Sequence, residues 1–530
     1  MSDSNLPARI ASTLIIGGGP AGMACAWELV KAGRKNIVIL ERESQVGGLA
    51  RTLQFDLPGV GAFRTDIGPH RFFSKNAYLY RLIEDVLGER WTLVDRFTRF
   101  HIGGRFYLYP PQIRNVMQGL GLWRCFKVIR DIGWERVKDI FRTRKIATFE
   151  DHVIHEFGRT LAEFNMINYT EKIWGLPCRE ISPNWAEQRI KGLGIGALIK
   201  SLLKKNAGHA EQPPPAVAGT SSAPVGTSSA PVGGSERKSG AKSLADRFYY
   251  PLGGAGVTYE TIRDRIGGLG GCRVESGCHV TAVERGPDGR IATVVYDQAG
   301  VQKRIACEHL VSTMLLTDLV EALHPAAPPD ILAARAKLRY RSQVYVFLMV
   351  DLPQVGPDNW VYFPDAQVPF ARMYEPANFS RPMSPPGKSS LLLEHFCFAD
   401  DPVWQRGENA PDAMVRDDIQ WLVKLGFLRD SAQVLGWRIH RERNVYPIYD
   451  LTYQAPLADV LQYVESIPNL QCAGRGGRFR YTNQDHSLEM GILAAQGILR
   501  GAKLAVENVG AEKEYFEAGY VPARSNTDPA

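Results

Sequence analysis

The sequence lacks the patterns of several protein classes. None of its eight cysteines lies in a Cys-x-x-Cys pair and no zinc-finger spacing occurs, so we expect no metal site. No run of about 18 apolar residues is present, so nothing is expected to span a membrane. The opening residues MSDSNLPARIAS have no apolar signal-peptide core. Scattered cysteines without such a signal are typical of reduced thiols, and we therefore expect a cytoplasmic protein.

The excess of positive charge is small. The formal net charge is +7 over 530 residues. No RNP-type motif is present, so a nucleic-acid partner is not expected, and the charge suits an anionic ligand or a membrane surface better. A chain of this length is too long for one hydrophobic core, so two or more packing units are expected.

A strand–turn–helix–strand pattern opens the chain. Thr13–Ile16 is a short apolar run of β type, and Ala21–Ala32 has the composition of a helix. Asn36–Leu40 is a second apolar strand that ends at an acidic residue, Glu41. Such a unit within about 30 residues is typical of dinucleotide-binding folds.

The turn of this unit matches the spacing G-x-G-x-x-G. Gly17 permits the tight turn, Gly19 lets the backbone approach a pyrophosphate, and Gly22 allows close helix–strand packing. Pro20 and Ala21 begin the helix between them, and the free N–H groups of a helix N-terminus attract phosphate. The pattern therefore predicts that phosphates of a dinucleotide lie on this loop.

The next stretch, ERESQVGGLART, bears on which dinucleotide is expected, NAD or FAD. Glu41 is placed to accept hydrogen bonds from ribose hydroxyls, and an acid there favours an unphosphorylated 2′-OH. Arg42, the glycine pair ending at Gly48, Leu49 and Arg51 follow. This stretch resembles the second glycine motif of the amine oxidase, protoporphyrinogen oxidase and phytoene desaturase flavoproteins. The resemblance implies FAD, with the glycines close to the cofactor and Arg51 facing its phosphates.

The resemblance continues along most of the chain. FRTDIGPHRFF (63–73) is similar to the segment beside the isoalloxazine ring, which implies contacts from Pro69 and His70. HVTAVERG (279–286) resembles the strand whose valine, here Val280, meets the adenine edge. AGRGGRFRY (473–481) is similar to the motif that returns to the phosphates and the flavin through Gly474 and Arg475. YPLGGAG (250–256) resembles a further motif of the same superfamily.

The expected fold is α/β (α+β overall), a Rossmann-like flavoprotein with two dinucleotide-binding domains and a substrate domain of helices and antiparallel sheet. Residues 206–242 contain PPP and a repeated GTSSAPV, a composition that cannot form a core and predicts disorder. The expected segments are FAD-binding segments at 10–75, 244–320 and 431–505, a helical cap at 76–204, a disordered insertion at 205–243, a substrate-domain sheet at 321–430 and a polar tail at 506–530.

Several motifs are also similar to those of UDP-galactopyranose mutases. They are NYTEKIWG (168–175), LRYRS (338–342) and the spacing of Arg475, Tyr481 and Asn483. The resemblance implies that Arg341 and Tyr481 contact a substrate diphosphate and that Arg475 contacts the flavin. Asn483 stands where the mutases have aspartate, and VSTMLLTDLVEAL (311–323) resembles the protoporphyrinogen oxidase branch instead.

Four other side chains have two interpretations each. His70 either hydrogen-bonds a flavin carbonyl or changes charge with the flavin, or it is a buried turn histidine. Arg339 and Arg341 share one face of a strand, which suits a diphosphate or an exposed surface. Asp485 is either the N-cap of the last helix, which is our expectation, or an acid catalyst.

The stretch 122–145 mixes large apolar residues with arginines and lysines. It either lies on an anionic membrane, which would suit an apolar or lipid-linked substrate, or is a cap helix whose apolar side packs on the domain. The second interpretation is our expectation, with peripheral contact at the inner membrane face as the alternative.

Three functions remain open from the sequence. The first is an FAD-dependent oxidoreductase that transfers hydride from an organic substrate to flavin N5, with His70, Arg341 and Tyr481 as candidate catalytic residues. The second is a redox-neutral flavin mutase that acts on a nucleotide sugar. The third is a non-enzymatic, membrane-associated protein that retains FAD. The oligomeric state stays open.

Overall fold

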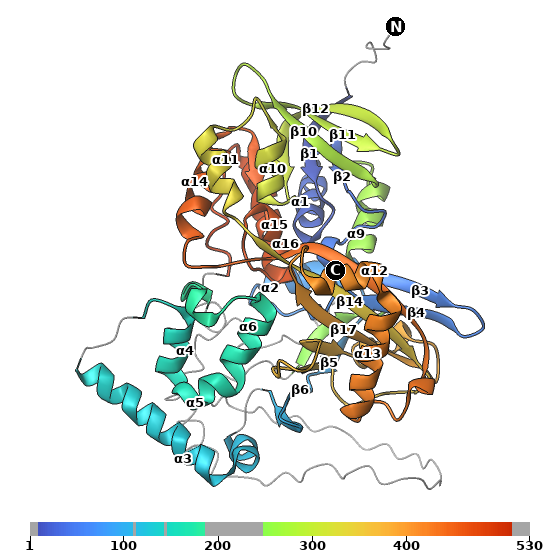
Figure 1. Cartoon of the computed structure of the whole chain (residues 1–530). Helices are drawn as coiled ribbons and strands as arrows, with labels where there is room; N and C mark the ends of the chain where they lie inside the picture. Colours follow the sequence, from blue (N-terminus) through green and yellow to red (C-terminus); the bar gives the residue numbers. More distant parts are fainter. Residues whose placement is uncertain (1–8, 110–112, 142–145, 186–246, 511–530) are drawn as a thin grey trace, which may run out of the picture.

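A computed structural model of the chain describes residues 9–109, 113–141, 146–185 and 247–510. Two large β-sheets occupy opposite ends of the molecule, and a group of helices lies beside the second sheet (Figure 1). The insertion predicted at 205–243 and most of the predicted polar tail lie outside the described residues.

The first sheet has eight strands and combines parallel with antiparallel pairing. Its central strand β1 pairs in parallel with β2 and β12, and β10, β11 and β12 form an antiparallel meander. The strands are β1 (Arg9–Ile16), β2 (Ile37–Leu40), β9 (Cys272–Glu275), β10 (Cys278–Arg285), β11 (Ile291–Gln298), β12 (Val301–Ser312), β13 (Leu323–His324) and β19 (Leu470–Cys472).

Helices cover both faces of the first sheet. Alternate strand residues point to opposite faces, so Ile15 packs with one set of helices, whereas Leu14 and Ile16 pack with the other. The first set is α1 (Pro20–Lys31), α2 (Ala77–Leu87), α9 (Gly256–Gly268) and α16 (Gln484–Arg500). The second set is α10 (Leu316–Ala322), α11 (Pro329–Ala336) and α14 (Gln454–Ser466).

The predicted opening unit is confirmed. Strand β1 and strand β2 pair in parallel around α1, which begins with Pro20 at its first position. Proline suits this position because its missing N–H would have no partner inside the helix. Helix α2 is capped at both ends, since Asn76 accepts a hydrogen bond from Tyr78 N at 3.0 Å and Gly88 follows the last residue of the helix.

The second sheet has seven strands. Its order is β18 (Val434–Pro447), β14 (Tyr340–Val350), β17 (Ser389–Cys397), β16 (Arg372–Tyr374), β15 (Trp360–Tyr362), β6 (Thr98–Ile102) and β7 (Arg105–Leu108). Every residue of β14 is buried. Helices α12 (Pro402–Asn409) and α13 (Pro411–Lys424) cover one face of the sheet, and two small two-stranded sheets cover the other. These small sheets pair β3 (Thr52–Leu57) with β4 (Gly61–Asp66) and β5 (Trp91–Asp95) with β8 (Arg247–Pro251).

Strand β18 departs from the expected division of the chain. Residues 431–505 were expected to belong to the FAD-binding part, but Val434–Pro447 pairs with β14 along the second sheet. Most positions of strand β18 are half-buried, and only Glu442, Val445 and Pro447 are buried. Its sequence therefore gave no sign of which sheet it would join, and the register with the buried strand β14 decided the outcome.

The helical region beside the second sheet contains α3 (Ile113–Ile140), α4 (Phe149–Phe157), α5 (Arg159–Leu161) and α6 (Asn168–Trp174). Helix α3 lies along the outer edge of the molecule, and α4, α5 and α6 lie between it and the rest of the protein (Figure 1). Gly121, at φ 75°, interrupts α3 with a non-helical conformation.

Candidate functional site

A cavity of about 770 Å³ lies at the carboxyl ends of β1 and β2. Its wall includes the turn after β1, the start of β10, the loop around His70, the end of β18 and the start of α16. Ligands of open α/β sheets bind at the carboxyl ends of strands, and this volume falls in the range of about 300–1,000 Å³ typical of small-molecule sites.

Two glycine turns face each other in the wall of the cavity. Gly19 is the N-cap of α1. Because glycine has no side chain, no side-chain oxygen accepts from the N–H groups of the first turn. The Cα of Gly48 approaches Gly19, and a methyl group on Gly48 would lie 3.1 Å from the Gly19 Cα. The Gly47 N–H donates to Gly18 O at 2.8 Å and joins the turns. This bare backbone at a helix N-terminus fits a phosphate group.

Gly17 and Gly22 allow α1 to pack closely against the turn that follows β1. Gly17 adopts φ 98°, which favours glycine. A methyl group on Gly22 would overlap the carbonyl oxygen of Gly17. Gly22 does not line the cavity. Its part in a cofactor site is therefore the close approach of α1 to the turn, as the motif predicts.

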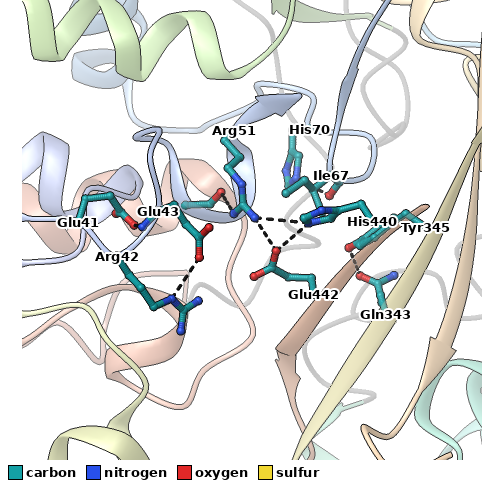
Figure 2. Close-up of polar contacts among 11 residues, drawn as sticks. Glu41, Arg42, Glu43, Arg51, Ile67, His70, Gln343, Tyr345, His440 and Glu442 are labelled. Carbon is teal, nitrogen blue, oxygen red and sulfur yellow. Dashed lines mark hydrogen bonds and ion pairs between the residues drawn. The ribbon is translucent and has the colours of Figure 1, made fainter. Parts of the chain in front are cut away.

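Glu41 is held at the end of β2 by two backbone amides. Its Oε2 accepts from Gly18 N at 2.6 Å and its Oε1 accepts from Glu43 N at 2.9 Å, as Figure 2 shows in part. Burial raises the pKa of this carboxyl, and the two amides partly oppose that effect. Each oxygen keeps a further lone pair, so Glu41 is able to accept from ligand hydroxyls at the cavity.

A buried ion pair joins the second glycine turn to β18. Arg51 donates to Gly48 O at 2.9 Å and to Glu442 Oε2 at 2.6 Å, and His440 Nε2 lies 3.0 Å from the same Glu442 oxygen (Figure 2). Since the carboxylate only accepts, His440 donates this hydrogen bond. Hydrogen bonds from His440 and the charge of Arg51 lower the pKa of Glu442, against the effect of burial.

The sequence interpretation missed Glu442 and His440. They are two residues apart on β18, so their side chains lie on the same face of the strand, but neither belongs to a sequence motif. The chain separation between Arg51 and Glu442 is 391 residues. Only an expectation that β18 crosses the cavity would have identified this partner for Arg51.

The loop that carries His70 rests on a second buried ion pair. Arg372 donates to both oxygens of Glu394, at 2.6 and 2.5 Å. Gly68 passes over this pair, since a methyl group there would lie 3.5 Å from Arg372 Nη2. From the other side, Gln484 Nε2 donates to His70 O at 3.2 Å and to Arg71 O at 2.9 Å. The loop is therefore held by β16, β17 and α16 together.

His70 is an uncharged side chain in this setting. Burial lowers its pKa to about 4, and the neighbouring positive charges of Arg475 and Arg372 act in the same direction. Its Nε2 lies 2.9 Å from Ile67 O and must donate, because a carbonyl only accepts. A neutral imidazole has one N–H, so a hydrogen bond from His70 to a flavin carbonyl requires this contact to break. With this pKa, a change of charge near neutral pH is not expected.

The cavity brings together most of the predicted cofactor residues. Its lining includes Gly17, Gly19, Pro20, Ala21, Glu41, Arg42, Gly48, Leu49, Arg51, Pro69, His70, Val280, Gly474, Arg475 and Asn483. Arg341 and Tyr481, predicted to contact substrate, are not among the lining residues. Further lining residues that the sequence interpretation did not single out include Thr313, Asp318, Asn444 and Gln484.

Arg341 points into the protein instead of toward a ligand. Its side chain is 3% exposed and donates to Ile173 O at 2.9 Å and to Phe396 O at 3.0 Å. Gly175 gives it room, because a methyl group there would lie 2.7 Å from the guanidinium carbon. The two segments NYTEKIWG and LRYRS therefore pack on each other. Arg339 is exposed and pairs with Asp450 at 3.1 Å, so the expected two-arginine face does not form.

Tyr481 belongs to an aromatic cluster at the edge of the cavity. Its ring stacks on Tyr446 with 5.5 Å between centroids. The guanidinium of Arg475, which lines the cavity, lies 4.9 Å from the Tyr446 ring and 5.2 Å from the Tyr481 ring. The interpretation of Asp485 as an N-cap is wrong, since Asn483 occupies that position and Asp485 lies in the first turn of α16.

Comparisons with known proteins agree with this architecture. A family model described as an NAD(P)-binding Rossmann-like domain matches residues 15–86. The structure of reduced UDP-galactopyranose mutase is similar over 96% of this chain and 97% of that chain, with 22% identity and a TM-score of 0.75. Cyclohexylamine oxidase from Brevibacterium oxydans IH-35A is similar over 93% and 99%, with 15% identity and a TM-score of 0.59.

A third solved structure, putrescine oxidase bound to putrescine, covers 93% of this chain and 100% of its own, with 13% identity and a TM-score of 0.58. At these identities the likeness shows the fold. The predicted resemblance to the amine oxidase-like flavoproteins and to UDP-galactopyranose mutase is confirmed at that level, and so is the predicted Rossmann-like fold class. The glycine turns in the wall of the cavity and the match to a Rossmann-like family model fit a dinucleotide cofactor.

The two glutamate–arginine pairs of β18 allow a matched test of the buried one. Glu442→Gln removes the charge that compensates buried Arg51, and we expect it to lower the free energy of unfolding by about 3 kcal/mol. Glu408→Gln breaks the surface pair with Arg441, whose atoms lie 2.7 Å apart, and should lower it by less than about 1 kcal/mol. Urea unfolding of both variants measures the difference. Equal losses would show that Glu442 is not a buried partner of Arg51.

The lowered pKa of His70 predicts a pH dependence of stability. In the unfolded chain His70 becomes protonated below the ordinary histidine pKa of 6.5. In the folded protein it becomes protonated only near pH 4. Stability contributed by His70 is therefore present above pH 6.5 and lost as the pH falls toward 4. In urea unfolding at several pH values, His70→Asn should lose less stability than the natural protein over this window. Parallel curves would contradict an uncharged, buried His70.

Proposed function

We propose that the chain binds FAD and is an oxidoreductase that transfers hydride from an organic substrate to flavin N5. The observation that supports it is one cavity that runs from Glu41, past the paired glycine turns, to the loop of His70 and Arg475. An adenine dinucleotide has its charged phosphates between its two ends. The cavity offers bare backbone amides between an acidic end and an aromatic, arginine-containing end.

The proposal assigns a part of FAD to each region of the wall. Gly17, Gly19, Pro20 and the N–H of Ala21 surround the phosphates, with Gly48 and Gly474 opposite. Glu41 accepts from the ribose, and the backbone of Val280 lies at the adenine. The second glycine turn and Arg51 extend the cradle beyond the first motif, which favours FAD over a nicotinamide dinucleotide.

The remaining residues of the wall position the ring and the substrate. Bound FAD supplies hydride acceptance at N5. Pro69, His70 and Asn483 lie at the ring end of the cavity. His70 stays uncharged and keeps the loop in place, so it transfers no proton in this proposal. Arg475 places a positive charge at the same end and is supported by Thr482 O, to which its Nε donates at 3.1 Å.

A redox-neutral mutase that acts on a nucleotide sugar is the second candidate. Two observations favour it: the TM-score of 0.75 with UDP-galactopyranose mutase, against 0.59 with cyclohexylamine oxidase, and the stacking of Tyr446 and Tyr481 against Arg475. Arg341 opposes it, because its guanidinium is bound to two backbone carbonyls and does not reach the cavity. We therefore rank the oxidoreductase first.

Two glycine variants test the proposed cofactor. Gly48 and Gly59 both have positive φ, at 54° and 76°, so alanine strains both turns alike. A methyl group on Gly48 would press against Gly19, whereas nothing lies within 4 Å of one on Gly59. We expect the purified protein to carry FAD that heat releases, Gly48→Ala to weaken its binding at least about tenfold, and Gly59→Ala to retain it. A colourless protein that takes up no FAD would overturn the proposal.

Substrate assays without oxygen separate the two reactions. Oxidised protein is titrated with amines, tetrapyrroles and nucleotide sugars while the flavin absorbance is recorded. An oxidoreductase loses its flavin absorbance with one class of compound and recovers it when an acceptor is added. A mutase leaves the absorbance unchanged and converts a nucleotide sugar only after dithionite reduction. FAD binding without either reaction would support the third function, a protein that retains FAD but catalyses nothing.

A further inference from the structure

Helix α3 touches the protein with one side only. It packs against α4, α5 and β7, and it forms the outer edge of the helical region (Figure 1). A methyl group on Gly158 would lie 3.0 Å from Ile132 N, so α3 lies very close to the loop between α4 and α5. Its opposite side has no comparable neighbour among the parts of the chain that the structure describes.

Polar groups attach the inner side of α3. Asp131 Oδ2 accepts from Thr160 N at 3.0 Å and from Thr160 Oγ1 at 2.7 Å, at the start of α5. Asp139 lies 2.9 Å from the imidazole of His155 on α4. Glu135, also on this side, is buried. The acidic residues of the helix are therefore directed toward the protein.

The outer side of α3 is apolar. We call it the α3 apolar face, and its side chains, between 39% and 75% exposed, are Trp123, Phe126, Ile129, Trp134, Val137, Ile140 and Phe141. At about 100° per residue these positions form one stripe along the helix. The rings of Trp123 and Phe126 stack with centroids 5.9 Å apart. The expectation that the apolar side packs on the domain is therefore wrong.

The stretch that carries this face has an excess of positive charge. Residues 122–145 contain eight basic and three acidic residues. The acidic three are Asp131, Glu135 and Asp139 of the inner side, which pair with Arg130, Lys138 and Arg136 of the same helix. Lys127 lies over the Trp123 ring at 5.6 Å. By its sequence the stretch therefore has more basic than acidic residues, and this excess suits an anionic partner.

We propose that α3 docks the protein on the surface of a bilayer that contains anionic phospholipid. A helix with one apolar side, tryptophan and an excess of basic residues lies in the membrane interface, where the tryptophans prefer the headgroup level and the cations attract anionic lipid. Within the described residues, no helix is long and apolar enough to cross a membrane. Pairing with a second copy through this face would bring together two stretches that each have an excess of basic residues, which opposes a dimer at low salt.

Vesicle co-sedimentation of the full flavoprotein tests this docking. The double variant Trp134→Ser, Ile140→Ser removes two side chains of the α3 apolar face. Its control, Leu269→Ser, Val301→Ser, removes two others that are 63% and 57% exposed elsewhere. With phosphatidylcholine–phosphatidylglycerol vesicles we expect the first variant to bind at least about tenfold more weakly than the natural protein and the control to bind equally well. Thermal unfolding checks that both variants fold.

Salt and lipid charge provide the second measurement. Binding should weaken steeply as salt is added, and it should be much weaker to phosphatidylcholine alone. Equal binding to neutral vesicles, no binding, or equal binding by the α3 variant would overturn the proposal. So would light scattering that shows a dimer which Trp134→Ser, Ile140→Ser dissociates, because the face would then join two copies. None of these results depends on catalysis, so the docking and the proposed reaction fail separately.

Discussion

The close contact of two turns without side chains is the constraint on which the site depends. Gly19 and Gly48 meet backbone to backbone, and behind them Gly22 lets α1 rest against the carbonyl of Gly17. Gly491 of α16 repeats this arrangement, because a methyl group there would overlap the carbonyl of Ala21. Helix α1 is therefore clamped at its first turn by a strand, a second turn and a helix. Its unpaired N–H groups point at the cavity because nothing bulky separates these elements.

Buried charges then join the two sheets around the cavity. Arg51 comes from the turn beside the first sheet, and its partner Glu442 comes from the second sheet. Arg372 and Glu394 are neighbours within the second sheet, and the loop of His70 passes over them at Gly68. Unpaired, each of these charges would be costly to bury. The pair of Arg51 with Glu442 therefore requires the two sheets to meet in one relative position, and that position shapes the cavity.

The placement of charged residues also distinguishes the surface helix α3. In α3 the carboxylates face inward and accept from backbone and side-chain donors of the neighbouring helices, and Ile132 packs against the core, so attachment to the protein does not use the α3 apolar face. An ordinary surface helix has the reverse arrangement, with its apolar stripe against the core. The orientation of α3 is decided by its polar contacts with Thr160 and His155, and hydropathy along the chain could not show this.

Short-range patterns in the sequence determined the nucleotide-binding unit. The strand, the glycine turn, the helix and Glu41 are local, and each glycine of the first turn has a steric reason, so the loop and Glu41 followed from spacing. The other predicted cavity residues, such as Val280 and Arg475, came from the resemblance to known flavoproteins. The motif around His70 placed that residue correctly at the cavity but did not reveal its hydrogen bond to Ile67 or its lowered pKa, since burial by distant elements sets both.

Only the tertiary structure decided which distant strands complete the wall. Strand β18 joined the second sheet and brought Glu442 to Arg51 across 391 positions of the chain. Arg341 turned to the carbonyls of Ile173 and Phe396, although its motif suggested a diphosphate. The direction of a long side chain depends on which acceptors surround it, and those acceptors come from elements that the local sequence does not specify. The sequence thus determined the glycine turn that we propose holds a phosphate, and packing decided what surrounds that turn.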